Sequence, residues 1–147
     1  MQPVVAADAY PLITTERLAE VRQFYVEQLQ FEVVFEASWF LLVAGPGPRS
    51  PLIAFMHSSH PSAPPGPETF AGRGMIWTLQ VGDAAAAYAD VQSLGLPVPY
   101  QLTEEPWGQR RFMLRDPAGL LLDIVEQTVP NDGFWNRYAG LAGSSIA

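Results

Sequence analysis

The chain has 147 residues, no cysteine and a formal net charge of −7 at pH 7. This length forms one domain, or two small modules that share a core, and it needs no disulfide to stabilise it. The negative charge argues against nucleic acid and anionic membranes as partners, and the absence of Cys excludes thiolate chemistry.

The first half of the chain predicts a strand, a helix and three further strands. Apolar residues recur at helical spacing from Leu18 to Leu29, so we expect the helix over about residues 16–28. Gly and Pro at 45–48 interrupt the pattern between the last two strands. The four strands are expected near residues 9–15, 32–37, 39–44 and 52–57.

Residues 58–73 are rich in Pro and Gly. We interpret them as a linker between two modules, at about 8–57 and 74–127, with a lid over a cleft as the alternative. His60, inside this segment, is predicted to lie on the surface.

The second half repeats the order of the first. A strand over about 75–81 is followed by Asp83, a good N-cap for a helix that runs to Leu94, and Gly95 ends the helix. The remaining strands are expected near residues 98–103, 110–115 and 121–126.

The last two of these strands form a hairpin around Asp116–Leu120. Asp116 can bond its own downstream backbone, and Gly119 tolerates a positive φ. If these five residues form the loop, Arg111 pairs with Val125 and Met113 pairs with Asp123. Period-two alternation then puts Arg111, Met113 and Arg115 on the side of Asp123, and it leaves Phe112 and Leu114 for the core.

The tail predicts a short helix at about 131–140, with Phe134, Trp135 and Tyr138 at helical spacing. Three aromatic side chains need a surface to cover. That surface belongs either to the same chain or to a second copy.

This order of elements resembles the vicinal oxygen chelate superfamily, which includes glyoxalase I, the extradiol dioxygenases and the bleomycin-resistance proteins. The resemblance covers about residues 8–127 and is carried by Phe24-Tyr25, Leu29-Gln-Phe31, Val81-Gly-Asp83, Pro106-Trp-Gly108 and Asp116-Pro-Ala-Gly119. It implies an α+β fold within one domain spanning 1–147. Two βαβββ modules would form curved mixed sheets around a ligand cleft.

Enzymes that this chain resembles hold a divalent metal through His and Glu on the first and last strands of the modules. The matching positions here are Tyr10, Ile76 and Asp123, with the fourth near Phe55 or His57. Because Tyr10 and Ile76 depart from the pattern, we expect no cofactor. If a metal binds, His57 and Asp123 are its expected ligands, and they are two where catalytic zinc sites generally have three.

The candidate ligand-binding residues combine aromatic faces with a few polar groups. They are Tyr10, Trp39, Phe55, His57, Ile76, Thr78, Trp107, Arg111, Met113 and Asp123. The rings could sandwich a flat ligand, and Arg111 with Arg115 would suit an anionic or carbonyl-rich one. Asp123 is a partner in a structural ion pair, a ligand-binding group or general base, or a metal ligand.

The leading hypothesis is a metal-independent protein that binds and sequesters an aromatic or planar small molecule, such as an antibiotic. The first alternative is a divalent-metal-dependent lyase or dioxygenase of the same superfamily. The second is a non-catalytic dimeric interaction domain. We expect a homodimer from the resemblance and the aromatic tail, and a cytoplasmic location because residues 1–15 do not form a targeting signal.

Overall fold

The computed structural model describes residues 2–61 and 68–141, which form two compact units. The first unit holds residues up to 74 together with the turn at 116–120. The second holds residues 75–115 and those from 121 onward. Among the described residues, no helix combines the length and apolar character that a transmembrane span requires.

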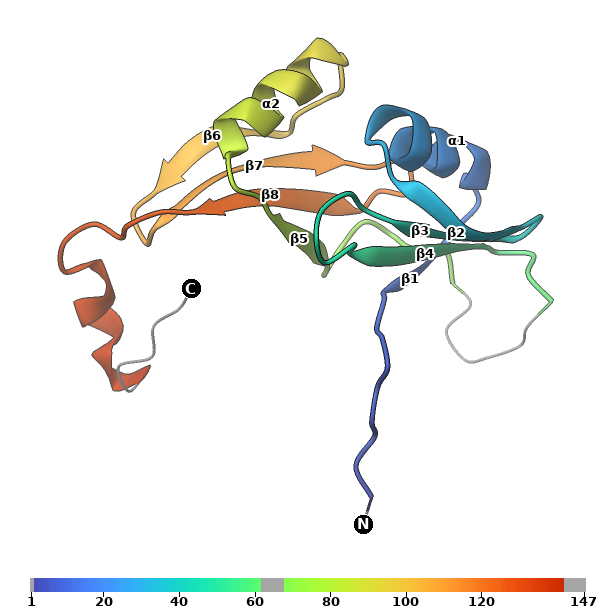
Figure 1. The fold of residues 1–147 in the computed structure, drawn as a ribbon, viewed down its shortest axis with the longest axis horizontal. Helices are drawn as coiled ribbons and strands as arrows, with labels where there is room; N and C mark the ends of the chain where they lie inside the picture. Colours follow the sequence, from blue (N-terminus) through green and yellow to red (C-terminus); the bar gives the residue numbers. More distant parts are fainter. Residues whose placement is uncertain (1, 62–67, 142–147) are drawn as a thin grey trace. The chain divides into compact units, whose positions relative to one another are not determined.

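The first unit is a four-stranded sheet with a helix against it (Figure 1). Its elements are β1 (Leu12–Thr15), α1 (Leu18–Arg22), the π-helix η1 (Gln23–Gln28), β2 (Glu32–Ala37), β3 (Phe40–Ala44) and β4 (Leu52–His57). The strand order is β1-β4-β3-β2, in which only the β1–β4 pair is parallel. Helix α1 contacts β3 and β4.

The second unit repeats this arrangement. Its elements are β5 (Ile76–Gln80), α2 (Ala84–Ser93), β6 (Tyr100–Glu105), β7 (Gln109–Arg115), β8 (Leu121–Gln127) and the 3-10 helix η2 (Phe134–Leu141). The strand order is β5-β8-β7-β6, in which only the β5–β8 pair is parallel. Helix α2 contacts β6, β7 and β8 (Figure 1).

The predicted fold class is therefore confirmed as α+β, with two mixed sheets built from βαβββ repeats. The first strand and the first helix each differ from expectation. The first strand begins at Leu12, so Tyr10 precedes the sheet. The expected single helix changes to π geometry at Gln23, and Phe24 and Tyr25 within this wider turn are both buried.

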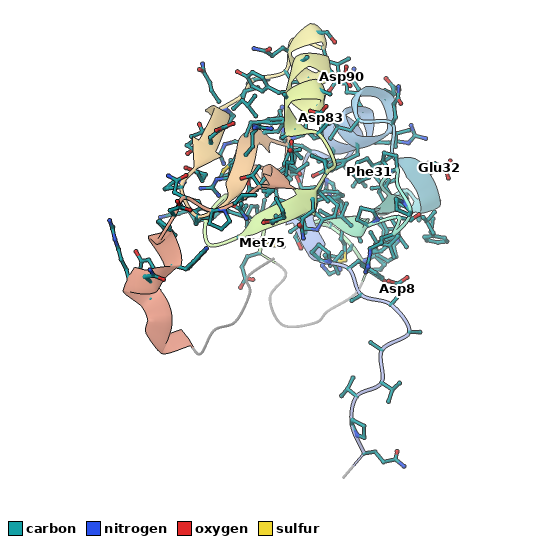
Figure 2. All side chains as sticks on the ribbon, turned by 60° about the vertical axis from the view of Figure 1, so that its left-hand side comes forward. Asp8, Phe31, Glu32, Met75, Asp83 and Asp90 are labelled. Carbon is teal, nitrogen blue, oxygen red and sulfur yellow. The ribbon has the colours of Figure 1, made fainter. Side chains whose placement is uncertain are left out.

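Helix α2 begins and ends where the sequence predicts. The side chain of Asp83 accepts a hydrogen bond of 3.0 Å from the backbone N–H of Ala86. At the other end Gly95 has a φ of +71°, which suits a residue without a Cβ. Figure 2 labels Asp83 at the start of this helix and Asp90 further along it.

The turn between β7 and β8 also has the predicted geometry. Asp116 Oδ1 accepts hydrogen bonds from the backbone N–H groups of Ala118 and Leu120, each at 2.9 Å. Gly119 has a φ of +94°. As a result Arg111 pairs with Val125 and Met113 with Asp123, which is the predicted register.

The segment after β4 departs from the prediction at His60, which is buried rather than on the surface. The backbone N–H of His60 donates to the carbonyl of His57, and this turn directs the residue back toward Trp39, whose ring centroid lies 6.5 Å from that of His60. Further on, Phe70 N–H donates to the carbonyl of Thr14 in β1. The middle of the predicted linker or lid, residues 62–67, lies outside the described residues.

Candidate ligand-binding site

The second unit places an arginine between two acidic side chains. Arg111, on β7, donates from Nε to Glu105 Oε2 at 2.7 Å and from Nη1 to Asp123 Oδ2 at 3.2 Å. The Glu105 and Asp123 side chains are only 9% and 7% exposed. Ion pairs this protected from water are screened less than surface pairs, and losing one partner leaves the other charge buried.

Two aromatic rings hold the same guanidinium group. The Arg111 Cζ atom lies 5.3 Å from the ring centroid of Tyr100 and 5.2 Å from that of Trp107. The Tyr100 hydroxyl also donates to Glu105 Oε2 at 2.8 Å. Cation–π contacts of this kind contribute about 0.5–2 kcal/mol each, so the rings and carboxylates together fix the guanidinium in one place.

Trp107 is positioned by the chain that follows β8. Its Nε1 donates to Gln109 Oε1 at 2.8 Å, and its carbonyl accepts from Trp135 Nε1 at 3.1 Å. The ring of Phe134 lies 6.2 Å from that of Trp107. Phe134 and Trp135 of the tail therefore contact this loop of their own chain, and Tyr138 stays 47% exposed.

Asp123 has one carboxylate oxygen without a partner. Its Oδ2 accepts from Arg111, whereas its Oδ1 is buried and makes no hydrogen bond among the described residues. Burial raises the pKa of Asp123 above its ordinary value, and the charge and hydrogen bond of Arg111 oppose that rise. An unsatisfied buried acceptor costs free energy and demands an explanation.

Strand alternation brings several predicted residues to one face of this sheet. Thr78 on β5 and Met113 on β7 are the register partners of Asp123 on β8. Ile76 and Thr78 are exposed, and Ile76 is exposed by 49%. Phe112, of the opposite parity, is fully buried and contacts the ring of Tyr88 in α2. The face that carries Asp123 is therefore the one that α2 does not cover.

The sequence did not reveal that Tyr100 and Glu105 belong to this face. Strict alternation along β6 puts residues five apart on opposite sides. The register between β6 and β7 shifts between Tyr100 and Thr103, and this irregularity returns both side chains to the side of Arg111. No turn residue or glycine marks the shift in the sequence.

The guanidinium group of Arg111 is already paired with acceptors of its own chain. Its guanidinium was predicted to meet an anionic or carbonyl-rich ligand, but Glu105 and Asp123 already accept its hydrogen bonds. Two carboxylates against one guanidinium leave the cluster with a formal charge of −1. The unpartnered group of this cluster is therefore a carboxylate oxygen, Asp123 Oδ1, which can accept a further hydrogen bond.

The other predicted residues lie in the first unit. Phe55 is fully buried with its ring 5.1 Å from that of Tyr25, so it is a core residue on the helix side of its sheet rather than a surface ligand. Tyr10 is 46% exposed before β1. Trp39 occupies a turn beside Phe40, and His57 Nδ1 is hydrogen-bonded to Ser59 Oγ at 2.7 Å.

A pocket of about 280 Å³ also occurs in the first unit, between α1 and strands β2 and β3. Its lining residues are Leu18, Ala19, Arg22, Glu36, Ala37, Ser38 and Leu41. None of the predicted ligand-binding residues lines it, and the Arg22–Glu36 ion pair leaves no unpartnered charge there.

The donor set at Asp123 does not fit a divalent metal. Across residues 2–61 and 68–141, no three His, Cys, Asp or Glu side chains are grouped so that they could hold one. Glu105 and Asp123 come close to such a group, but the Arg111 guanidinium lies between them. His57, the other expected ligand, lies at the end of β4, where its Nδ1 is hydrogen-bonded to Ser59 Oγ.

Solved structures of similar fold extend over most of the chain. A glyoxalase/bleomycin resistance protein/dioxygenase from Nocardioides has a TM-score of 0.67 at 16% identity, covering 98% of this chain and 91% of its own. TnmS3, an antibiotic binding protein from Streptomyces sp. CB03234, has a TM-score of 0.64 at 23% identity, covering 86% and 100%. Lactoylglutathione lyase from Agrobacterium tumefaciens has a TM-score of 0.63 at 18% identity, covering 84% and 96%.

No curated protein matches the chain significantly. The family model of the Glyoxalase/Bleomycin resistance protein/Dioxygenase superfamily matches residues 8–124. That span includes both βαβββ repeats up to Ile124 in β8. The chain therefore belongs to the Glyoxalase/Bleomycin resistance protein/Dioxygenase superfamily.

Proposed function

We propose that this protein binds and sequesters a planar small molecule, without a metal and without converting it. The binding surface is the face of the β5-β8-β7-β6 sheet that carries Arg111 and Asp123. The observation that carries the proposal is the Arg111 guanidinium, which lies beside the rings of Tyr100 and Trp107 and is paired with two buried carboxylates. Such a pre-organised aromatic and charged surface suits recognition of a flat molecule.

The similarity to TnmS3 supports an antibiotic as the kind of molecule bound, since that protein is an antibiotic binding protein. The same fold also occurs in a lactoylglutathione lyase. The donor set described above favours binding over metal-assisted conversion, because a guanidinium separates the two carboxylates that come closest to a metal site.

We further propose that the protein forms a homodimer. Edge strand β2 exposes Val33, Val34 and Phe35 by 37%, 55% and 57%. Exposed apolar side chains on an edge strand are uncommon unless a partner covers them. Sedimentation equilibrium of the wild type and of a Phe35→Lys variant tests this, since the variant is expected to be monomeric.

Titration of a panel of planar aromatic compounds, followed by tryptophan emission, tests the proposed function. Trp107→Phe is expected to weaken binding by about fivefold to tenfold, the effect of about 1 kcal/mol of lost ring contact. Tyr88→Phe, on helix α2 against the opposite face of the same sheet, is the control and should leave affinity unchanged. Affinity that responds to neither substitution, or a panel that never alters the emission, would refute the proposal.

A further inference from the structure

We infer that the molecule bound on this face carries a hydrogen-bond donor, of which a protonated amine is the best fit, and that this donor meets Asp123 Oδ1. The inference rests on the proposed function and adds the chemical class of the ligand. Among the described residues of this site, Asp123 Oδ1 is the buried acceptor that has no hydrogen-bond partner.

The surrounding strands do not supply this donor. Met113, the register partner on β7, has none to offer, and Thr78, the partner on β5, makes no hydrogen bond with Oδ1. Arg111 is already shared between Asp123 Oδ2 and Glu105 Oε2. Asp123 is only 5% exposed, so a donor reaches this oxygen only when the side chains that cover it shift on binding. A ligand donor would remove the cost of the unpaired acceptor.

The charge of the cluster selects among possible donors. Within the cluster of Glu105, Asp123 and Arg111, two negative charges meet one positive charge, so a cation would balance these three groups and an anion would not. Burial raises the pKa of Asp123 although the charge and hydrogen bond of Arg111 oppose the rise, in line with this charge balance.

A pair of planar probes of equal ring number tests the inference by calorimetry. 9-Aminoacridine is a cation with N–H donors, and 9-anthracenecarboxylate is an anion with acceptors only. The wild type is expected to bind the cation at least about tenfold more tightly, the effect of one hydrogen bond to a charged group. Asp123→Asn should bring the two affinities within about threefold of each other, because it removes that charge.

Asp90→Asn is the matched control. It removes the same charge from α2, where Figure 2 labels Asp90, and this helix contacts the opposite face of the sheet. The preference for the cation should therefore be preserved. Thermal unfolding of both variants verifies that they are folded before titration.

The outcomes separate the inference from the proposed function. Equal binding of the two probes, or tighter binding of the anion, overturns the inference and leaves planar binding intact. A preference that survives Asp123→Asn also overturns it, because the donor then meets another group. If neither probe nor any compound of the panel binds, the proposed function fails and the inference fails with it.

Discussion

Tyr25 donates its phenolic hydrogen to Asp116 Oδ2 over 2.6 Å, although the two residues are 91 positions apart. Tyr25 is fully buried and Asp116 is 3% exposed. The bond ties the turn between β7 and β8 to η1 within the first compact unit. Burial raises the pKa of the Tyr25 hydroxyl and also that of Asp116, and in Asp116 the hydrogen bond from Tyr25 opposes the rise.

Tyr25→Phe is therefore expected to destabilise the protein while keeping its core packed. The ring retains its contacts with Phe24, Phe31 and Phe55, but Asp116 Oδ2 loses its donor in a buried place. The loss should be about 1–3 kcal/mol in the free energy of unfolding, measured by urea denaturation.

Tyr88→Phe provides the control for this measurement. The Tyr88 ring contacts Phe112, but its hydroxyl makes no hydrogen bond among the described residues. Its removal should change stability by less than about 0.5 kcal/mol. If both substitutions cost the same, the Tyr25–Asp116 bond does not contribute what its geometry indicates.

This bond marks the limit of what the sequence could predict. The sequence identifies Asp116 as a turn residue because an aspartate there can bond the backbone of the next few residues. Its Oδ1 does so by accepting from Ala118 and Leu120. Its Oδ2 partner is set by how distant segments pack. Phe24 and Tyr25 were expected on an apolar helix face, but nothing in that spacing indicates that the hydroxyl would be satisfied by an aspartate far along the chain.

The candidate site was likewise predictable from the sequence only in part. Register along β7 and β8 follows from loop length and parity, so Arg111, Met113 and Asp123 were placed correctly relative to one another. The irregularity in β6 that adds Tyr100 and Glu105 has no such signature. Phe55 was expected among the ligand-binding residues but lies in the core, and its strand, buried almost throughout, has no polar alternation that would fix parity.

Gly108 offers a second prediction, because it sets the loop that holds Trp107. Its φ is +107°, and a Cβ there would lie 2.9 Å from both Pro130 Cγ and the carbonyl oxygen of Thr128. Gly108→Ala should lower stability by about 1–3 kcal/mol and weaken planar-ligand binding by displacing Trp107. Both effects are measurable, by thermal unfolding and by titration.

Gly82→Ala is the control for Gly108, since a Cβ at Gly82 would meet nothing within 4 Å. It should leave ligand affinity unchanged. Equal effects of the two substitutions on binding would show that the loop at 106–108 does not position Trp107 for the ligand.

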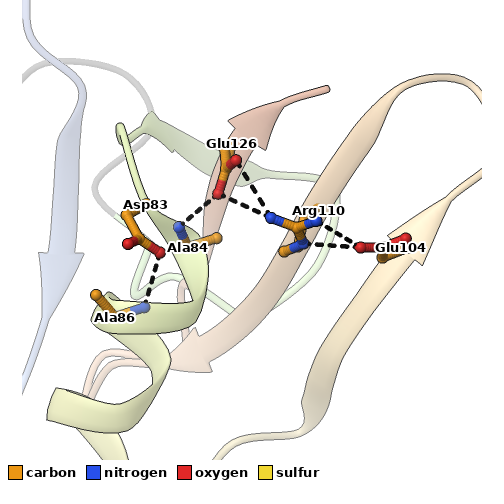
Figure 3. A network of polar contacts seen from close by, with 6 residues as sticks. All are labelled: Asp83, Ala84, Ala86, Glu104, Arg110 and Glu126. Atoms are coloured by element: carbon orange, nitrogen blue, oxygen red, sulfur yellow. Dashed lines mark hydrogen bonds and ion pairs between the residues drawn. The ribbon is translucent and has the colours of Figure 1, made fainter. Parts of the chain in front are cut away.

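A third prediction concerns the network around Arg110 (Figure 3). Glu126 Oε1 accepts from the backbone N–H of Ala84 at the start of α2 at 2.9 Å, and its Oε2 is 3.3 Å from Arg110 Nη1. Its side chain is 21% exposed, whereas that of Glu104, the other partner of Arg110, is 73% exposed. Of these two partners of Arg110, only Glu126 also accepts a hydrogen bond at the positive N-terminal end of a helix.

Glu126→Gln should cost about 0.5–1 kcal/mol, because it removes a charge next to the helix N-terminus and Arg110. Glu104→Gln, the exposed partner, should cost less than about 0.3 kcal/mol. The difference should shrink in high salt, which screens the charge interactions. Chemical denaturation at low and high salt measures both effects, and a larger loss at Glu104 would contradict the assignment.

The fourth prediction uses the raised pKa of Asp123, whose ordinary value is 3.8. A carboxyl with a higher pKa in the folded than in the unfolded state stabilises the fold fully below its ordinary pKa. It loses that contribution as the pH rises through the folded pKa. The charged groups that shift the pKa of Asp123 are Arg111 from β7 and Glu105 from β6, and Thr78 from β5 is uncharged. Arg115 of β7 shares this face by register. None of these charged groups is removed in Asp123→Asn.

The free energy of unfolding of the wild type minus that of Asp123→Asn should therefore fall as the pH rises from about 3.5 toward neutrality. The raised pKa of Asp116 is common to both proteins, so it cancels in this difference. Urea denaturation at a series of pH values measures the trend. A difference that grows with pH would mean that the Arg111 charge outweighs burial at Asp123, contrary to the raised pKa used here.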